Sequence, residues 1–204
     1  MAIQFRDRTI DDFKGKLIGG GARPNLFEVQ LFLPPNLGVT SNLNDVEEKM
    51  RFMIKTAELP ASTIGDIPIP FRGRVLHVAG DRTFEPWTVT IINDVDFSIR
   101  STMERWSNAI NKHEDTSGVI NPTDYQRDAI VDQLGKAQNK TGNRNLPVLR
   151  RYKFHGIYPT NVTAIPLDYG STDQIEEFQV TFQVQWWEAY KVGEGDAETP
   201  DLTN

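Results

Sequence analysis

The spacing of apolar residues along the chain predicts a protein built mostly from β-strands. Alternating or continuous apolar runs bounded by turn residues predict strands over 26–33, 49–59, 74–79, 87–92, 148–158 and 178–188. One helix is predicted over 96–112, where four apolar residues recur at helical spacing behind a candidate aspartate N-cap: Ile99, Met103, Trp106 and Ile110, with Asp94 or Asp96. The segment 127–134 fits either a strand or a helix. The mixture predicts a mainly β domain of the sandwich or barrel type with one flanking helix.

The last predicted strand, FQVTFQVQWWE (178–188), has two chemically different sides. One side is apolar and is predicted to face the core: Phe178, Val180, Phe182, Val184 and Trp186. The other side is polar and uncharged: Gln179, Thr181, Gln183 and Gln185. Neighbours on a strand point to opposite faces, so Trp187 is predicted to face outward. Exposed tryptophan is typical of interface centres, which makes Trp187 a candidate inter-subunit anchor; an exposed ring at a strand end is the simpler alternative.

Composition shifts divide the chain into three parts. Residues 1–22 are charged and then glycine-rich, and are predicted to form a flexible N-terminal arm. Residues 23–190 form the β domain, with a polar inserted loop over 34–48. Prolines punctuate 60–80, and because proline cannot donate to a strand ladder, this segment is predicted to be a projecting hairpin. Residues 191–204 are an acidic C-terminal tail, predicted to be disordered until a partner holds it.

Composition also excludes several kinds of chemistry. The 204 residues include no cysteine, which excludes thiolate catalysis, disulfides and cysteine-based metal sites. The net charge of −6 argues against a tight grip on DNA. No apolar run is long enough for a membrane anchor and no secretory signal is visible, so we expect synthesis in a cytoplasm. Motifs for metal binding, phosphate binding or nucleophilic catalysis are missing. Structural roles explain better the residues that come nearest to such a motif: His77, His113 and His155, the Asp124, Asp128 and Asp132 set, the 93–96 run, and the glycines at 19–21. We expect no metal, no cofactor, no catalytic residue and no enzymatic activity.

Three blocks in collinear order carry a resemblance to a known family. They are GARPNLFEVQL (21–31), LHVAGDRTFEPWTVTIIND (76–94) and FHGIYPTNVTAIPLDYGSTDQIEEFQVTFQVQWWE (154–188), with ELPASTIGDIPIPF between the first two. Over about residues 22–188 the chain resembles the tail tube proteins of contractile-tailed bacteriophages, whose fold is shared with type VI secretion tube proteins. The loop at 34–48, the N-terminal arm and the acidic tail depart from the family pattern.

The resemblance implies an assembly and a set of partners. Six subunits would join their inner sheets into a ring barrel, and rings would stack into a hollow tube inside a contractile sheath, as part of the virion tail. Double-stranded DNA would pass through the bore without lasting contact. The implied partners are the chain itself, the tail sheath protein, and the baseplate and tail terminator proteins.

Residue roles follow from this implied assembly. An uncharged wall would hold DNA weakly, because it lacks the lysine and arginine contacts that release counterions. The residues expected to line the bore are therefore Gln179, Thr181, Gln183 and Gln185. The projecting hairpin would contact the next ring through Ile67, Ile69, Phe71, Arg72 and Arg74. Three alternatives stay open at this point: a tube-initiating baseplate protein, a secretion-system tube subunit, and, in a different class, a monomeric β-sandwich module that binds carbohydrate or peptide.

Overall fold

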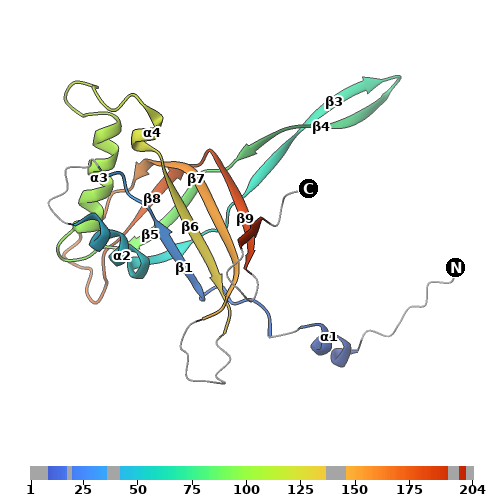
Figure 1. The fold of residues 1–204 in the computed structure, drawn as a ribbon, viewed down its shortest axis with the longest axis horizontal. Helices are drawn as coiled ribbons and strands as arrows, with labels where there is room; N and C mark the ends of the chain where they lie inside the picture. Colours follow the sequence, from blue (N-terminus) through green and yellow to red (C-terminus); the bar gives the residue numbers. More distant parts are fainter. Residues whose placement is uncertain (1–8, 18–19, 36–41, 137–145, 193–197, 201–204) are drawn as a thin grey trace.

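A computed structural model describes residues 9–17, 20–35, 42–136, 146–192 and 198–200. Its helices are α1 (Ile10–Lys16), α2 (Leu43–Met53), α3 (Ser98–Ile110) and α4 (Pro122–Tyr125). Its strands are β1 (Phe27–Leu31), β2 (Ile54–Ala57), β3 (Ser62–Phe71), β4 (Arg74–Phe84), β5 (Trp87–Ile92), β6 (Arg127–Leu134), β7 (Val148–Val162), β8 (Glu177–Gln183), β9 (Trp186–Val192) and β10 (Glu198–Pro200) (Figure 1). The mainly β fold class is confirmed, and the segment 127–134 is a strand.

Most strands belong to one antiparallel sheet that is folded over at β7. The strand order is β1-β6-β7-β8-β5-β2, and β9 pairs with β7 and β10. The first part of β7 pairs with β6 and β9, and its last part, Tyr158–Val162, pairs with β8. Gly156, with φ of +63°, lies between the two parts. The described strands therefore form two layers, β1-β6-β7-β9 and β7-β8-β5-β2, which share β7 and do not close into a barrel within one chain (Figure 1).

The hydrophobic core fills the space between the two layers. Trp87 of β5 stacks on Phe154 of β7, with ring centroids 4.6 Å apart, and so joins one layer to the other. The inward residues of β8, Phe178, Val180 and Phe182, are buried as predicted. Other core residues come from each layer and from α2: Val29, Leu31, Val46, Met50, Val89, Ile91, Ala129, Val131 and Ile157.

The predicted helix over 96–112 corresponds to α3. Ile99, Met103 and Trp106 are buried on one side of it, and the Trp106 indole N–H donates to the Tyr125 carbonyl at 2.9 Å. The N-cap differs from the prediction, because Phe97 occupies it in the left-handed conformation. The Asp96 carboxylate acts one residue earlier and accepts from the Ser98 N–H at 3.3 Å.

A second helix, α2, was missed by the sequence analysis. Residues 49–59 were predicted to be a strand after a loop over 34–48, but Leu43–Met53 is helical and only Ile54–Ala57 is a strand. Val46 and Met50 are buried one helical turn apart, whereas Phe52 is 79% exposed. The helix period therefore overrides the short alternation read from Met50, Phe52 and Ile54. Residues 36–41 of the predicted loop lie outside the described residues.

The predicted strand over 178–188 is two strands with a break at Val184 and Gln185. β8 ends at Gln183 and β9 begins at Trp186, and the Gln185 N–H donates to the His155 carbonyl at 3.2 Å. The break shifts the side-chain alternation by one residue. The prediction that Trp186 packs in the core is therefore wrong: it is 42% exposed and stacks on His155 with centroids 4.0 Å apart.

Trp187, on the other hand, faces the core side of β9 and is partly buried. Its ring lies edge-on to Phe84 at 6.3 Å and to Tyr152 at 6.0 Å, and its indole N–H donates to the Ala61 carbonyl at 3.3 Å. The residue named as an outward anchor therefore packs mainly against its own subunit.

Both terminal extensions contain secondary structure that the sequence analysis did not predict. In the arm, α1 begins with a capping box in which Thr9 and Asp12 satisfy each other's backbone N–H groups. In the tail, β10 pairs with β9. Residues 1–8, 18–19, 193–197 and 201–204 lie outside the described residues. Among the described helices, none has the length and apolar character needed to cross a membrane.

Candidate functional site

The first candidate surface is the hairpin formed by β3 and β4. These two strands pair only with each other, and they extend away from the two-layered body (Figure 1). The connecting residues Arg72 and Gly73 both have positive φ, 46° and 82°, which is the backbone of a tight two-residue hairpin turn. The segment predicted to project over 60–80 thus forms a hairpin that continues to Phe84.

The hairpin exposes an unusual amount of apolar surface. Seven large apolar side chains on it are exposed: Ile64, Ile67, Ile69, Phe71, Val75, Leu76 and Val78. Three of the residues predicted to bind the next ring, Ile67, Ile69 and Phe71, belong to this set, and Arg72 and Arg74 flank the tip. The structure therefore brings all five predicted residues together at the outer part of one hairpin.

The second candidate surface is the outward face of the β2-β5-β8 sheet. Gln179, Thr181 and Gln183 share this face, and two threonines of β5 continue it, because Thr88 pairs with Thr181 and Thr90 pairs with Gln179. The hydroxyl oxygens of Thr88 and Thr181 are 3.1 Å apart. The predicted polar set is thus part of a wider surface that is uncharged from Gln179 to Gln183 and carries the Lys55–Glu177 ion pair at the start of β8. Gln185 is separated from this surface by the end of β8.

The outward face of the other layer is charged. Arg151 Nε donates to Asp132 Oδ1 at 2.7 Å across β7 and β6. Further along β7, Asp128 Oδ2 lies 3.4 Å from Lys153 Nζ and 3.4 Å from His155 Nδ1. The outward face of this layer is therefore densely ionic, whereas the face of the other layer sets neutral threonines and glutamines beside the Lys55–Glu177 ion pair.

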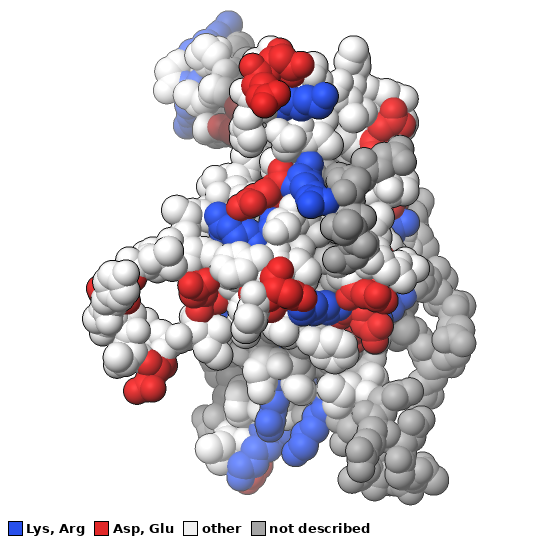
Figure 2. All heavy atoms as spheres, turned by 90° about the vertical axis from the view of Figure 1, so that its left-hand side faces the viewer, with Lys and Arg blue, Asp and Glu red and all other residues white. Residues whose placement is uncertain are grey.

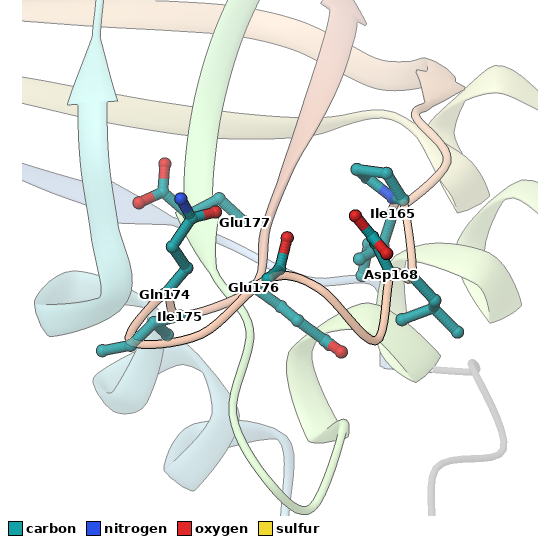
Figure 3. Close-up of a pocket in the computed structure, with 9 residues that line it drawn as sticks. Ile165, Asp168, Gln174, Ile175, Glu176 and Glu177 are labelled. Atoms are coloured by element: carbon teal, nitrogen blue, oxygen red, sulfur yellow. The ribbon is translucent and has the colours of Figure 1, made fainter.

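The third candidate surface is the loop over 163–176 between β7 and β8. It encloses a pocket of about 730 Å³ lined by Ile165, Pro166, Leu167, Asp168, Ser171, Gln174, Ile175, Glu176 and Glu177. Ile165 and Asp168 lie on one side of the pocket and Gln174 and Ile175 on the other (Figure 3). Leu167, Tyr169 and Ile175 are exposed. Sequence reasoning treated this segment only as a turn; the signal it passed over is the mixture of acidic and large apolar residues without any lysine or arginine.

An ionic cluster joins α2 to the start of α3. Lys49 Nζ lies 2.8 and 2.9 Å from the two oxygens of Asp96 and also contacts Asp94. The Lys49 ammonium holds the pKa of the Asp96 carboxyl well below its usual range. The carboxylates of Asp94 and Asp96 in turn raise the pKa of Lys49. The face that carries these helices displays acidic and basic side chains side by side (Figure 2).

The histidines do not form a shared site. His77 Nδ1 lies 2.6 Å from Asp66 on the hairpin, whereas His155 is on β7. Within the described residues, no group of three or more metal-ligating side chains is placed to hold an ion.

The fold and its surfaces define a class of protein: an open antiparallel β-sandwich with a projecting apolar hairpin. The same fold is found in the tube-terminating cap of the anti-feeding prophage, with a TM-score of 0.59, 16% identity, and coverage of 94% of this chain and 100% of that one. It is also found in the sheath–tube complex of an extracellular contractile injection system, with a TM-score of 0.54, 13% identity, and coverage of 88% and 97%.

Sequence comparison identifies the family. The family model described as phage tail tube protein matches residues 22–190. The tail tube protein gp19 of Enterobacteria phage T4 is 34% identical over 172 residues, covering 83% of this chain and 93% of the relative. The tail tube protein of Serratia phage KSP90 is 28% identical over 172 residues, covering 83% and 90%. The chain belongs to the phage tail tube protein family, which confirms the predicted resemblance and makes it a structural component of the virion tail.

Proposed function

We propose that the chain forms six-membered rings that stack into a hollow tube inside a contractile sheath, and that double-stranded DNA passes through the bore. The observation that carries the assembly is the hairpin with its seven exposed apolar side chains. Contiguous apolar patches of this kind are rare on proteins that stay monomeric, and they mark surfaces that another chain covers. The same observation weighs against the alternative of a monomeric binding module.

The stretch of the β5 and β8 face from Gln179 to Gln183 is uncharged, and this supports its assignment to the bore. Threonine and glutamine side chains hydrate the wall but offer no fixed positive charge to phosphates, so DNA is held weakly and moves easily. The ionic face of β6 and β7 lacks this property because Arg151 and Lys153 lie on it. We therefore assign Gln179, Thr181 and Gln183 to the channel wall.

The partners in this proposal are the sheath, baseplate and terminator proteins. Proteins with this fold were solved in a sheath–tube complex, a baseplate and a tube terminator assembly, and we extend these associations to the present chain. The role is structural rather than enzymatic.

Removal of the hairpin tests the assembly. Deleting residues 66–79 joins Gly65 directly to Gly80 and leaves the neighbouring pair, Ile64 and Arg82, in register. We expect soluble subunits whose unfolding temperature equals that of the parent chain but which form no tubes in electron micrographs. Normal tubes from this variant would overturn the proposal.

Charge added to the channel wall tests the DNA passage. Gln183→Lys places a cation on the face assigned to the bore, and we expect intact tubes with slower DNA ejection. Gln30→Lys is the matched control, because Gln30 lies on β1 beside the ionic face of β6. Equal ejection rates for both variants would contradict the assignment of this face to the bore.

A further inference from the structure

Two uncovered surfaces at different places on the chain are complementary in charge, and both expose apolar side chains. One is the hairpin tip, Phe71–Leu76, and the other is the loop over 163–176 with its pocket, here called the acidic loop. The inference drawn from them rests on the proposed stacking of rings and names the two surfaces that meet when one subunit binds the next.

The hairpin tip is basic and apolar. Residues 67–80 contain no aspartate or glutamate, and Arg72 and Arg74 flank Gly73 at the turn. The Arg72 guanidinium lies over the Phe71 ring, 5.3 Å from its centroid, so the cation and the aromatic ring form one surface. Phe71 and Leu76 are each more than half exposed, at 65% and 61%. A partner for this tip must therefore offer both negative charge and apolar surface.

The acidic loop offers both properties. Residues 163–176 contain Asp168, Asp173 and Glu176 and no lysine or arginine. Glu177, the first residue of β8, also lines the pocket but is ion-paired with Lys55. The apolar residues Ile165, Pro166, Leu167 and Ile175 line its pocket. A volume of about 730 Å³ lies in the range of pockets that take small organic ligands, and it has room for one or two large side chains.

The loop is held in shape by its own hydrogen bonds. The Gly170 N–H donates to Asp168 Oδ1 at 2.9 Å, and the Ser171 N–H donates to the Asp168 carbonyl at 3.1 Å. At the far end, the Asn93 side-chain amide donates to Glu176 Oε2 at 2.8 Å and ties the loop to the end of β5. The pocket is thus formed before any partner arrives, which lowers the entropy lost on binding.

The tip and the acidic loop lie at opposite ends of the subunit. In Figure 1 the hairpin reaches to the upper right, and the loop between β7 and β8 lies at the lower left. A subunit therefore cannot fill its own loop with its own tip. A contact between different patches of two identical chains is heterologous, and such contacts propagate from copy to copy, as a stacked tube requires.

We propose that the hairpin tip of one copy docks into the acidic loop of a second copy in the next ring. Phe71 and Leu76 contact the apolar lining of the pocket, and Arg72 and Arg74 face the loop carboxylates. The occupant is a second copy of this chain, because the chain itself carries the segment with the matching charge and apolar character.

Charge reversal tests the pairing. Arg72→Glu with Arg74→Glu inverts the tip, and Asp168→Arg with Asp173→Arg inverts the loop. Each double variant is expected to raise the subunit concentration needed for tube formation at least about tenfold at low ionic strength, because like charges then face each other. The chain carrying all four changes is expected to recover tubes. The control Glu48→Arg with Glu114→Arg makes the same charge change on exposed sites elsewhere and should assemble normally.

The outcomes separate this inference from the proposed function. If the parent and both reversed variants form tubes at the same concentration, the docking is overturned but the proposed tube assembly is not. If both double variants lose tube formation and the chain carrying all four changes does not regain it, the pairing is overturned as well. Absence of tubes from the parent chain would instead remove the proposed function.

Cross-linking provides a test that does not depend on the folding of charge-reversed chains. The sequence has no cysteine, so introduced thiols react without background. Leu76→Cys in one chain and Leu167→Cys in another, assembled together and oxidised, should give a dimer that contains one chain of each kind. The control pair, Leu76→Cys with Leu149→Cys on β7, should not cross-link. Assembled tubes without the first cross-link would overturn the docking.

Discussion

The bend in β7 at Gly156 makes a quantitative prediction about how the two layers are joined. Gly156 has φ of +63°, and a Cβ built on it would lie 2.7 Å from Gln185 Cγ and 3.2 Å from Gln126 Oε1. The Gly156 N–H also donates to Asp128 Oδ1 at 3.3 Å. A side chain at this position therefore meets both an unfavourable backbone conformation and two close neighbours.

Gly156→Ala is expected to lower the free energy of unfolding by about 1 to 2 kcal/mol. The left-handed conformation costs an L-residue about 1 to 2 kcal/mol. The contact with Gln185 adds little, because Gln185 is exposed and its side chain can move away. At a slope of about 2 kcal/mol per molar urea, the unfolding midpoint should fall by about 0.5 to 1 M, as followed by tryptophan fluorescence of the unassembled subunit.

A double-mutant cycle separates the two contributions. Gln185→Ala removes the Cγ atom but leaves the backbone of Gly156 unchanged, so the Gly156→Ala penalty should fall only slightly in that background. A penalty that disappears with Gln185→Ala would mean that crowding, and not the left-handed backbone, opposes the substitution. An unchanged midpoint for Gly156→Ala alone would refute the argument that the bend depends on glycine.

Three further predictions concern the core, the tryptophan pair and the ionic cluster. Phe182→Ala, at a fully buried site next to two tryptophans, should cost about 3 to 5 kcal/mol of stability by urea unfolding. Trp187→Ala should cost about 2 to 3 kcal/mol, whereas Trp186→Ala should cost less than about 1 kcal/mol; equal costs would contradict the one-residue shift in β9. The depressed pKa of Asp96 gives stability that is present above its unfolded value of about 3.9 and is lost as the pH falls below about 4. In the Lys49→Gln variant, the free energy of unfolding should therefore fall less steeply as the pH is lowered below about 4. The same steepness in parent and variant would contradict this.

The sequence predicts best where one face of an element is continuously buried. β1, β5 and α3 follow from the sequence because their apolar residues keep one period over the whole element, whereas the segment of β6 fits either a strand or a helix. The region around α2 misleads because Met50, Phe52 and Ile54 alternate over five residues, whereas the helix period shows only when Val46 and Met50 are taken together.

The break between β8 and β9 could not be read from the sequence. FQVTFQVQW (178–186) alternates without interruption, and the break comes from tertiary structure: the Gln185 N–H donates to the His155 carbonyl beside the bend in β7. Because the alternation changes phase there, the sequence assigns Trp186 and Trp187 to the wrong sides. The acidic loop was missed for a related reason, since a pocket depends on how a loop folds back and leaves no periodic signal.

The two prolines of the hairpin restrict how it can join another subunit. Pro68 pairs with His77 and Pro70 pairs with Val75, so the N–H groups that proline lacks are those that would point away from β4. A strand from a second subunit therefore finds no donors at these two positions along the outer edge of β3. The edge strands β1 and β2 contain no proline and keep their outer N–H groups for pairing. In the proposed assembly, this difference favours backbone pairing between neighbours within a ring and side-chain contacts of the hairpin tip between rings.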